Sequence, residues 1–169
     1  MTITAPPSAR MTTNDSQLAQ IFQYTVEAYK TFQKLAESLP NPMSASVFKA
    51  MAADERHFRD LLEIKYLDTG SRMKVTLGSD LRFQDMLEGD LAYREIAEML
   101  IARERTMERQ LTEASKNSGE SDRNLYRYLS TGKRSHVVLI ERELEMIRNY
   151  PDWFRREDAQ DLIVHGRSE

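Results

Sequence analysis

Two stretches of the chain share one pattern: FKAMAADERHFRDLL at residues 48–62 and YRYLSTGKRSHVVLI at residues 126–140. Each stretch carries an aromatic, an apolar, a small, a charged, a ring-bearing and an apolar residue at the same spacing. The matched pairs are Phe48 and Tyr126, Met51 and Leu129, Ala52 and Ser130, Glu55 and Lys133, Phe58 and His136, and Leu62 and Ile140. Because residues three or four apart share one face of a helix, both stretches predict helices that bury the same kind of face.

Periodic apolar residues extend outward from both stretches and predict four long helices. The predicted ranges are 15–39, 43–67, 90–116 and 121–149. Asp15 or Ser16 is expected to cap the first helix, and Ser44 or Ser46 the second, because short polar side chains accept hydrogen bonds from the free N–H groups of a first turn. The composition agrees, since helix formers abound and the chain holds only 6 glycines and 5 prolines.

Short turns at 40–43 and 117–120 predict two antiparallel helical hairpins, and the longer stretch 68–89, with a short helix near 81–87, joins them as a crossover. The sequence therefore predicts an all-α fold, an antiparallel four-helix bundle with a long crossover. The predicted organisation is a flexible tail at 1–14, the bundle at 15–149, and a C-terminal tail at 150–169 that holds a short helix around 153–164.

Composition narrows the classes of function. The 169 residues predict one domain, and 24 Lys and Arg against 27 Asp and Glu give a net charge of −3, which argues against nucleic-acid binding. The chain has no cysteine, so any metal must be held by carboxylate and imidazole groups. No stretch of 18 apolar residues and no apolar leader is present, so we expect no membrane span and a cytoplasmic location.

Over about residues 15–149 the chain resembles the rubrerythrin group of ferritin-like diiron-carboxylate proteins, and residues 48–62 carry the strongest likeness. In that family each half of the bundle has a Glu on one helix and Glu-x-x-His on the next. A Glu and a His three residues apart share a helix face, so they converge on a metal in the core. The resemblance implies a ferritin-like bundle, an iron or manganese centre and a homodimer.

Only part of the family's ligand set is present. The family positions, in chain order, are occupied by Thr25, Glu55, Phe58, Glu104, Lys133 and His136, with Met107 at a further carboxylate position. The resemblance thus leaves Glu55, Glu104 and His136 as metal ligands, while Thr25, Phe58 and Lys133 stand where ligands are expected. Lys133 places an ammonium where the family has a carboxylate, and Gly132 beside it indicates close packing or a local irregularity of the helix.

Three interpretations of these residues remain open. In the first, Lys133 pairs with Glu55 and Glu104, and His136 completes a buried ion network without metal. In the second, Glu55, Glu104 and His136 bind a single iron or manganese ion. In the third, the site is an intact dinuclear centre, with the register shifted so that Asp54 and His57 replace Glu55 and Phe58 on the inner face.

Two functions follow as expectations. The first is a ferritin-like protein whose diiron site is largely lost and which acts as a non-catalytic binding or assembly protein. The alternative is an iron- or manganese-dependent oxidoreductase that acts on peroxide or oxygen at the reduced site. A homodimer is expected in either case, with Trp153 and Phe154 as a docking element, and a protein partner is a further expectation.

Overall fold

The computed structural model describes residues 13–68 and 75–158, and within these ranges every regular element is a helix. The elements are α1 (Thr13–Ser38), α2 (Pro42–Asp68), α3 (Gln84–Glu88), α4 (Tyr93–Lys116), α5 (Glu120–Asn149) and the short 3₁₀ helix η1 (Trp153–Arg155). The prediction of an all-helical fold is therefore confirmed for the described residues. None of their helices carries an apolar stretch of the length that a membrane span requires.

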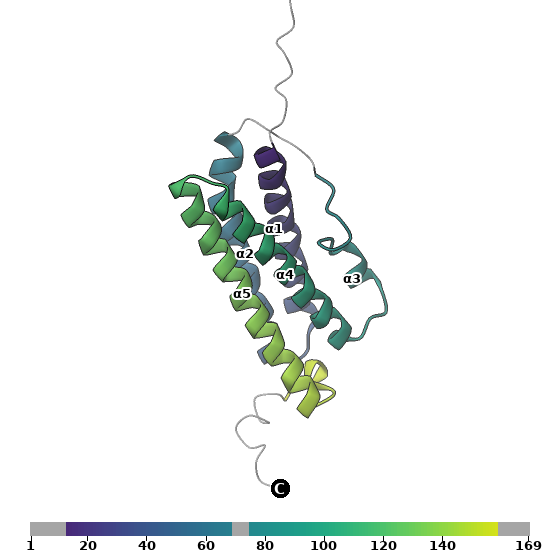
Figure 1. The fold of residues 1–169 in the computed structure, drawn as a ribbon. Coiled ribbons are helices and arrows are strands. Elements are labelled where there is room, and N and C mark those ends of the chain that lie inside the picture. Colours follow the sequence, from purple (N-terminus) through teal and green to yellow (C-terminus); the bar gives the residue numbers. More distant parts are fainter. Residues whose placement is uncertain (1–12, 69–74, 159–169) are drawn as a thin grey trace, which may run out of the picture.

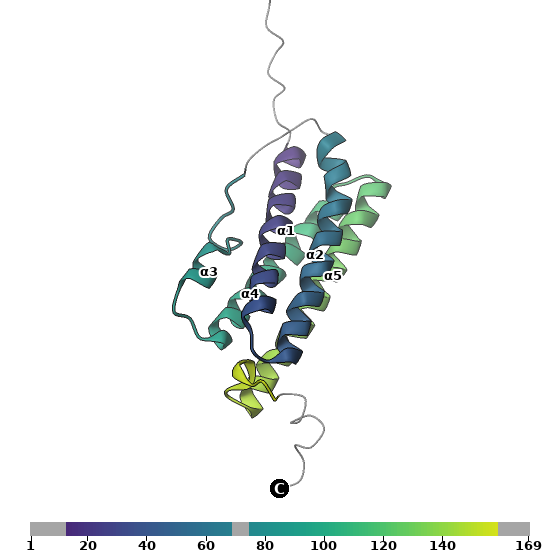
Figure 2. The same cartoon turned by 180° about the vertical axis from the view of Figure 1, so that it is seen from behind.

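The four long helices lie side by side as a bundle (Figure 1). α1 packs along α2, and α4 packs along α5, so each consecutive pair forms a hairpin. The two hairpins meet where α2 lies beside α5 and α1 beside α4. Figure 2, the view from behind, shows the short turn between α1 and α2 at the same end of the bundle as η1.

The crossover between the hairpins covers one side of the bundle, next to α1 and α4 (Figure 1). Its apolar side chains Leu77, Leu81, Phe83 and Met86 are buried against the long helices. The ring of Phe83 packs 5.1 Å, centroid to centroid, from the ring of Tyr24 on α1. The crossover thus closes the core on the side that the four helices leave open. Its helix begins later than predicted, at Gln84.

Several helix ends differ from the prediction. α1 begins at Thr13, which places Asp15 inside its first turn and not at its cap. The cap of α2 was predicted wrongly: Asn41 Oδ1 accepts hydrogen bonds from the backbone N–H groups of Met43 and Ser44, at 2.9 and 3.0 Å. The Ser44 hydroxyl donates instead to Glu143 on α5. α4 begins at Tyr93 and α5 at Glu120, while the predicted ends at 116 and 149 are confirmed.

The segment after α5 is fastened to the turn between α1 and α2. Trp153 Nε1 donates to Glu143 Oε2 at 2.8 Å, and Asn41 Nδ2 donates to the Trp153 carbonyl. Trp153 and Phe154 are only 2% and 3% exposed, so the prediction that they dock a second chain is wrong. They belong to the chain's own core. The helix predicted around 153–164 is a single 3₁₀ turn at Trp153–Arg155, and residues beyond 158 lie outside the described part.

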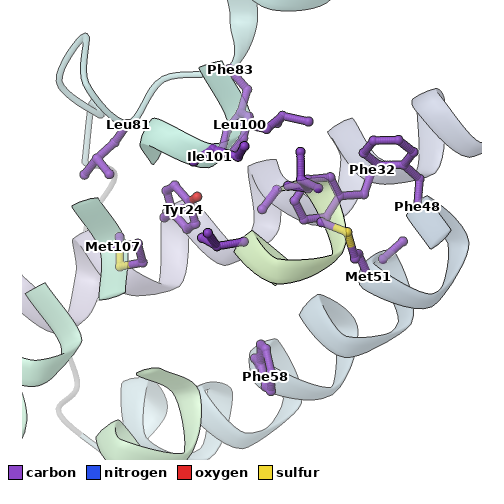
Figure 3. Packing of buried hydrophobic residues seen from close by; sticks show 14 of the residues in the cluster. Tyr24, Phe32, Phe48, Met51, Phe58, Leu81, Phe83, Leu100, Ile101 and Met107 are labelled. Atoms are coloured by element: carbon purple, nitrogen blue, oxygen red, sulfur yellow. The ribbon is translucent and has the colours of Figure 1, made fainter. Parts of the chain in front are cut away.

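One hydrophobic cluster runs through the bundle (Figure 3). It contains Phe32 and Phe48, whose rings pack 6.2 Å apart, and the fully buried Met51, Leu100 and Met107. Burial of such side chains supplies most of the free energy of folding. The four charged or ionisable groups described next lie inside this apolar interior.

A buried charged cluster as the candidate functional site

Glu55, Glu104, Lys133 and His136 meet in the core, although they come from three helices. Glu55 lies on α2, Glu104 on α4, and Lys133 and His136 on α5. Glu55, Glu104 and His136 are 0% exposed, and Lys133 is 2% exposed. One ligand atom from each of the two glutamates and the histidine lies within 4.8 Å of the others. The prediction that these side chains point inward and converge is therefore confirmed.

The ammonium of Lys133 lies among carboxylates and aromatic rings. Its Nζ donates to Glu55 Oε1 and lies 3.7 Å from Glu104 Oε2. The same atom lies 4.9 Å from the centroid of the Tyr24 ring and 5.5 Å from that of Phe58. A charge removed from water requires such partners, because an unpaired buried ammonium is strongly destabilising. Lys133 thus takes the ion-pairing position between the two glutamates.

His136 bridges the buried carboxylates and one carboxylate at the surface. Its Nδ1 lies 3.2 Å from Glu104 Oε2 and 3.4 Å from Glu55 Oε1, and its Nε2 lies 3.1 Å from Asp54 Oδ2. Burial lowers the pKa of His136, but the hydrogen bonds with Asp54, Glu104 and Glu55 outweigh burial and raise that pKa well above its usual value. In the protonated ring both nitrogens donate to carboxylates.

Asp54 belongs to the site only through this contact. Its side chain is 55% exposed, so it lies at the edge of the buried face, between α2 and α5. The alternative register, which paired Asp54 with His57, is wrong, because His57 is exposed and Phe58 is 4% exposed. The periodicity of α2 places Asp54 at a boundary, and the sequence holds no signal that His136, 82 residues away, reaches it.

Tyr24 also joins the cluster. Its hydroxyl donates to Glu104 Oε1 at 2.7 Å. Burial and the negative charges of Glu104 and Glu55 raise the pKa of Tyr24 well above its usual value, so the hydroxyl stays protonated and donates. Burial alone raises the pKa of Glu104, but the Lys133 charge and the hydrogen bonds from His136 and Tyr24 hold it below its usual value.

Gly132 makes room for one wall of the site. A Cβ atom at this position would lie 2.3 Å from Cζ of Phe58. Phe58 is held by further ring contacts, 5.9 Å from Tyr128 and 6.1 Å from His136 between centroids. The prediction that Gly132 marks close packing is therefore confirmed. The glycine lets the Phe58 ring lie against α5 beside the Lys133 ammonium.

The remaining family positions carry no ligand. Thr25 is buried, and its hydroxyl donates to the Ile21 carbonyl of its own helix at 2.8 Å. Met107 is fully buried among apolar side chains. The half of a dinuclear site that Thr25, Phe58 and Lys133 would have to build therefore offers no carboxylate and no imidazole.

Some features of the cluster favour the binding of a metal ion and others oppose it. Two ligand atoms of a small divalent ion, each roughly 2.1 Å from it, lie at most about 4.2 Å apart. The separations of up to 4.8 Å among the Glu55, Glu104 and His136 atoms slightly exceed that limit. Glu55 Oε2 is buried without a hydrogen-bond partner among the described groups. The Lys133 ammonium, however, stands beside the same glutamates and repels a cation.

Comparisons with known proteins give information about the fold alone. No known protein family matches the sequence, and no curated protein is similar to it. Among solved structures, a hypothetical protein from Pyrococcus furiosus is similar, with a TM-score of 0.65 at 16% sequence identity. The similarity covers 82% of this chain and 92% of that one. At this identity the shared helical architecture carries no statement about activity.

Proposed function

We propose that the chain is a ferritin-like protein of the rubrerythrin type in which an ammonium replaces the metal, and that it acts as a binding or assembly protein. The observation that carries the proposal is the place of Lys133, ion-paired with Glu55 and 3.7 Å from Glu104 in the interior. Two carboxylates face one ammonium and one protonated imidazole, so the four charges sum to zero without a metal ion.

Because its charges are balanced, the network can stabilise the folded structure. Each member has an oppositely charged neighbour inside a low-dielectric interior, where removal of any one leaves another charge unpaired. The network joins α2, α4 and α5, and through Tyr24 it also reaches α1. It therefore connects the two hairpins across the core. In this proposal the bundle is a rigid scaffold, and function resides on its surface.

The experiment measures metal content per chain by mass spectrometry after anaerobic loading with ferrous ion and, separately, with manganous ion. We expect less than about 0.1 ion per wild-type chain, because the metal must displace an ammonium that is ion-paired in the interior. Lys133→Ala removes that ammonium and is expected to raise the metal content. Lys49→Ala, at an exposed position of α2, is the control and should leave it unchanged.

A second candidate function is favoured by the closeness of Glu55, Glu104 and His136. These residues would hold one iron or manganese ion, which supplies redox or Lewis-acid chemistry when bound. Asp54 would orient the His136 ring from its far nitrogen. About one ion per wild-type chain, lost in His136→Ala and kept in the exposed-site variant His57→Ala, would establish this candidate and overturn the first.

A further inference from the structure

Two adjoining hollows are lined by residues from the beginning of α4, the end of α5 and the segment of η1. Figure 1 shows these parts of the chain at one end of the bundle. Their volumes are about 290 and 440 Å³, and both are lined by Arg94, Ile147 and Pro151. Because they share these three residues, the two hollows adjoin one another. We call the two hollows together the end groove, and no residue of the buried charged cluster lines it.

The floor of the end groove is apolar. Tyr93, Leu144 and Ile147 are half-buried, and they pack against the core from the outside. Phe154, which is 3% exposed, holds the ring of Tyr93 in an edge contact at 5.3 Å between centroids. The fastening of Trp153 to Glu143 fixes η1, and with it Phe154, at this place. The floor is therefore built by contacts within the chain itself.

The rim of the end groove is basic. Arg94 is ion-paired with Glu98 at 3.1 Å, so this pair is neutral. Arg148 and Arg155 are exposed, and the described part of the chain offers neither of them a hydrogen-bond or ion-pair partner. The remaining acid on the rim is Asp152. Each hollow is thus lined by one unpaired guanidinium group, that of Arg155 in one and that of Arg148 in the other.

We propose that the end groove binds an acidic peptide segment of a partner protein, in which an apolar side chain lies between two carboxylates. The carboxylates pair with Arg148 and Arg155, and the apolar side chain rests on Leu144 and Ile147. The inference deepens the proposed function and rests on it, because it names the kind of partner that a scaffold of this type would bind.

The chemistry of the rim argues for this partner. A guanidinium binds a carboxylate through two parallel hydrogen bonds, which gives geometric specificity as well as attraction. Arg155 lines one hollow and Arg148 the other, so a peptide that spans both hollows meets both guanidinium groups. An apolar floor with a charged rim is also the arrangement of protein–protein contact sites, whose anchors are apolar and whose edges are polar.

The test is fluorescence anisotropy with a fluorescein-labelled hexapeptide of alternating glutamate and leucine. We expect saturable binding to the full chain that weakens as salt increases. The double variant Arg148→Glu, Arg155→Glu should weaken binding at least about tenfold, a change of about 1.4 kcal/mol. The matched control, Arg56→Glu with Arg127→Glu, changes two exposed arginines outside the groove and should bind like wild type. A peptide with serine in place of leucine should bind more weakly.

Four results would overturn the inference: no saturable binding, equal binding of a lysine–leucine peptide, equal loss in both double variants, or binding to anionic phosphatidylglycerol vesicles without binding to the peptide. Self-association lost in Arg148→Glu, Arg155→Glu would likewise reassign the groove to a second copy of the chain.

Metal content is measured on the same samples. If the chain is free of metal and does not bind the peptide, only this inference is overturned. If the chain holds metal and binds the peptide, only the proposed scaffold role is overturned.

Discussion

The charge of the side chain at position 133 determines the charge balance of the buried cluster. The ammonium of Lys133 faces Glu55 and Glu104 within the core, and the rings of Tyr24 and Phe58 enclose it. A carboxylate at the same position would add a third negative charge to this interior, and only a cation could balance it. In the proposed ion network the ammonium and the protonated His136 ring together balance the two glutamates, so the identity of one side chain would decide between a metal centre and an ion network.

Lys133→Met should strongly destabilise the chain. The methionine fills a similar volume, but Glu55 and Glu104 lose their ammonium partner, and an unpaired buried charge costs about 3–5 kcal/mol. Urea denaturation followed by circular dichroism measures the free energy of unfolding. Lys49→Met, on the exposed face of α2, should change it little. Equal stability of the two variants would contradict a structural role for the network.

Gly132→Ala should destabilise the chain, even though alanine favours a helix over glycine. The added Cβ would meet Cζ of Phe58 at 2.3 Å, and overpacking of this kind costs about 1–3 kcal/mol. The second change Phe58→Leu should recover part of the loss, and a double-mutant cycle measures this coupling. Gly119→Ala, where an added Cβ meets nothing within 4 Å, is the control. Additive effects at 58 and 132 would argue against the close contact.

At the scale of elements, the ends of the helices are joined by polar side chains as much as by apolar packing. Asn41 caps α2 and holds the Trp153 carbonyl, so one side chain links the α1–α2 turn to η1. Glu143 on α5 accepts hydrogen bonds from Ser44 on α2 and from Trp153. These contacts fasten both hairpins at the end of the bundle that carries the end groove.

Asn41→Ala should lower the free energy of unfolding by about 2 kcal/mol. Loss of a helix cap costs about 1 kcal/mol, and loss of the bond to the Trp153 carbonyl removes a contribution of similar size. Ser46→Ala serves as the control, because the Ser46 hydroxyl is exposed and donates only to the Pro42 carbonyl of its own helix. Chemical denaturation of both variants measures the difference, and equal losses would exclude the cap.

Glu143→Gln should change how stability depends on pH. Burial raises the pKa of Glu143 in the folded chain, although the hydrogen bonds from Ser44 and Trp153 lower it in part. The folded chain therefore holds this proton more tightly than the unfolded chain. Its contribution to stability is complete below the unfolded pKa, about 4.3, and is lost as pH rises through the folded pKa.

Glutamine carries no titrating proton and still accepts hydrogen bonds through its carbonyl. The stability of wild type relative to Glu143→Gln should consequently fall as pH rises above about 4.3. Thermal melts of both proteins across this range measure the difference. A difference that stays constant with pH, or that grows with it, would contradict a raised pKa at Glu143.

At the scale of the whole molecule, two hairpins share one core, and the crossover covers only one side of it. The long helices are held by continuous backbone hydrogen bonds and by packing on several neighbours. The crossover around α3 contributes buried side chains such as Leu81 and Phe83, but its backbone makes few hydrogen bonds beyond Gly78–Leu81, Gly78–Arg82 and Phe83–Met86. The two parts should therefore open with different free energies.

Hydrogen exchange followed by mass spectrometry should resolve this difference. Amides of residues 75–92 are expected to exchange at least about a hundredfold faster than amides in the middle of α2 and α5, which carry Glu55 and Lys133. In Lys133→Met the middle of these helices should lose protection first, because the network joins them there. Uniform exchange along the chain would indicate that the crossover and the bundle unfold only together.

Features that depend on neighbours a few residues away could be predicted from the sequence. Apolar periodicity predicted four long helices and their inner faces, and the repeat predicted that Glu55, Lys133 and His136 point inward. The physical reason is that helix formation and the choice of a buried face are governed by spacings of three and four residues. The close packing at Gly132 could be predicted for the same reason, since Gly132 lies next to Lys133 in the repeated stretch.

Features that depend on how the helices are rotated and where their ends meet could be recognised only in the folded chain. The contact of Asp54 with His136 spans 82 residues, and that of Asn41 with Trp153 spans 112. Neither follows from local periodicity, because Asp54 lies at the edge of its helix face and Asn41 in a turn. The burial of Trp153 and Phe154, which the sequence suggested as a docking element, likewise depends on the place where α5 ends against the turn between α1 and α2. Contacts of this kind are set by the packing of distant elements, which a linear pattern does not encode.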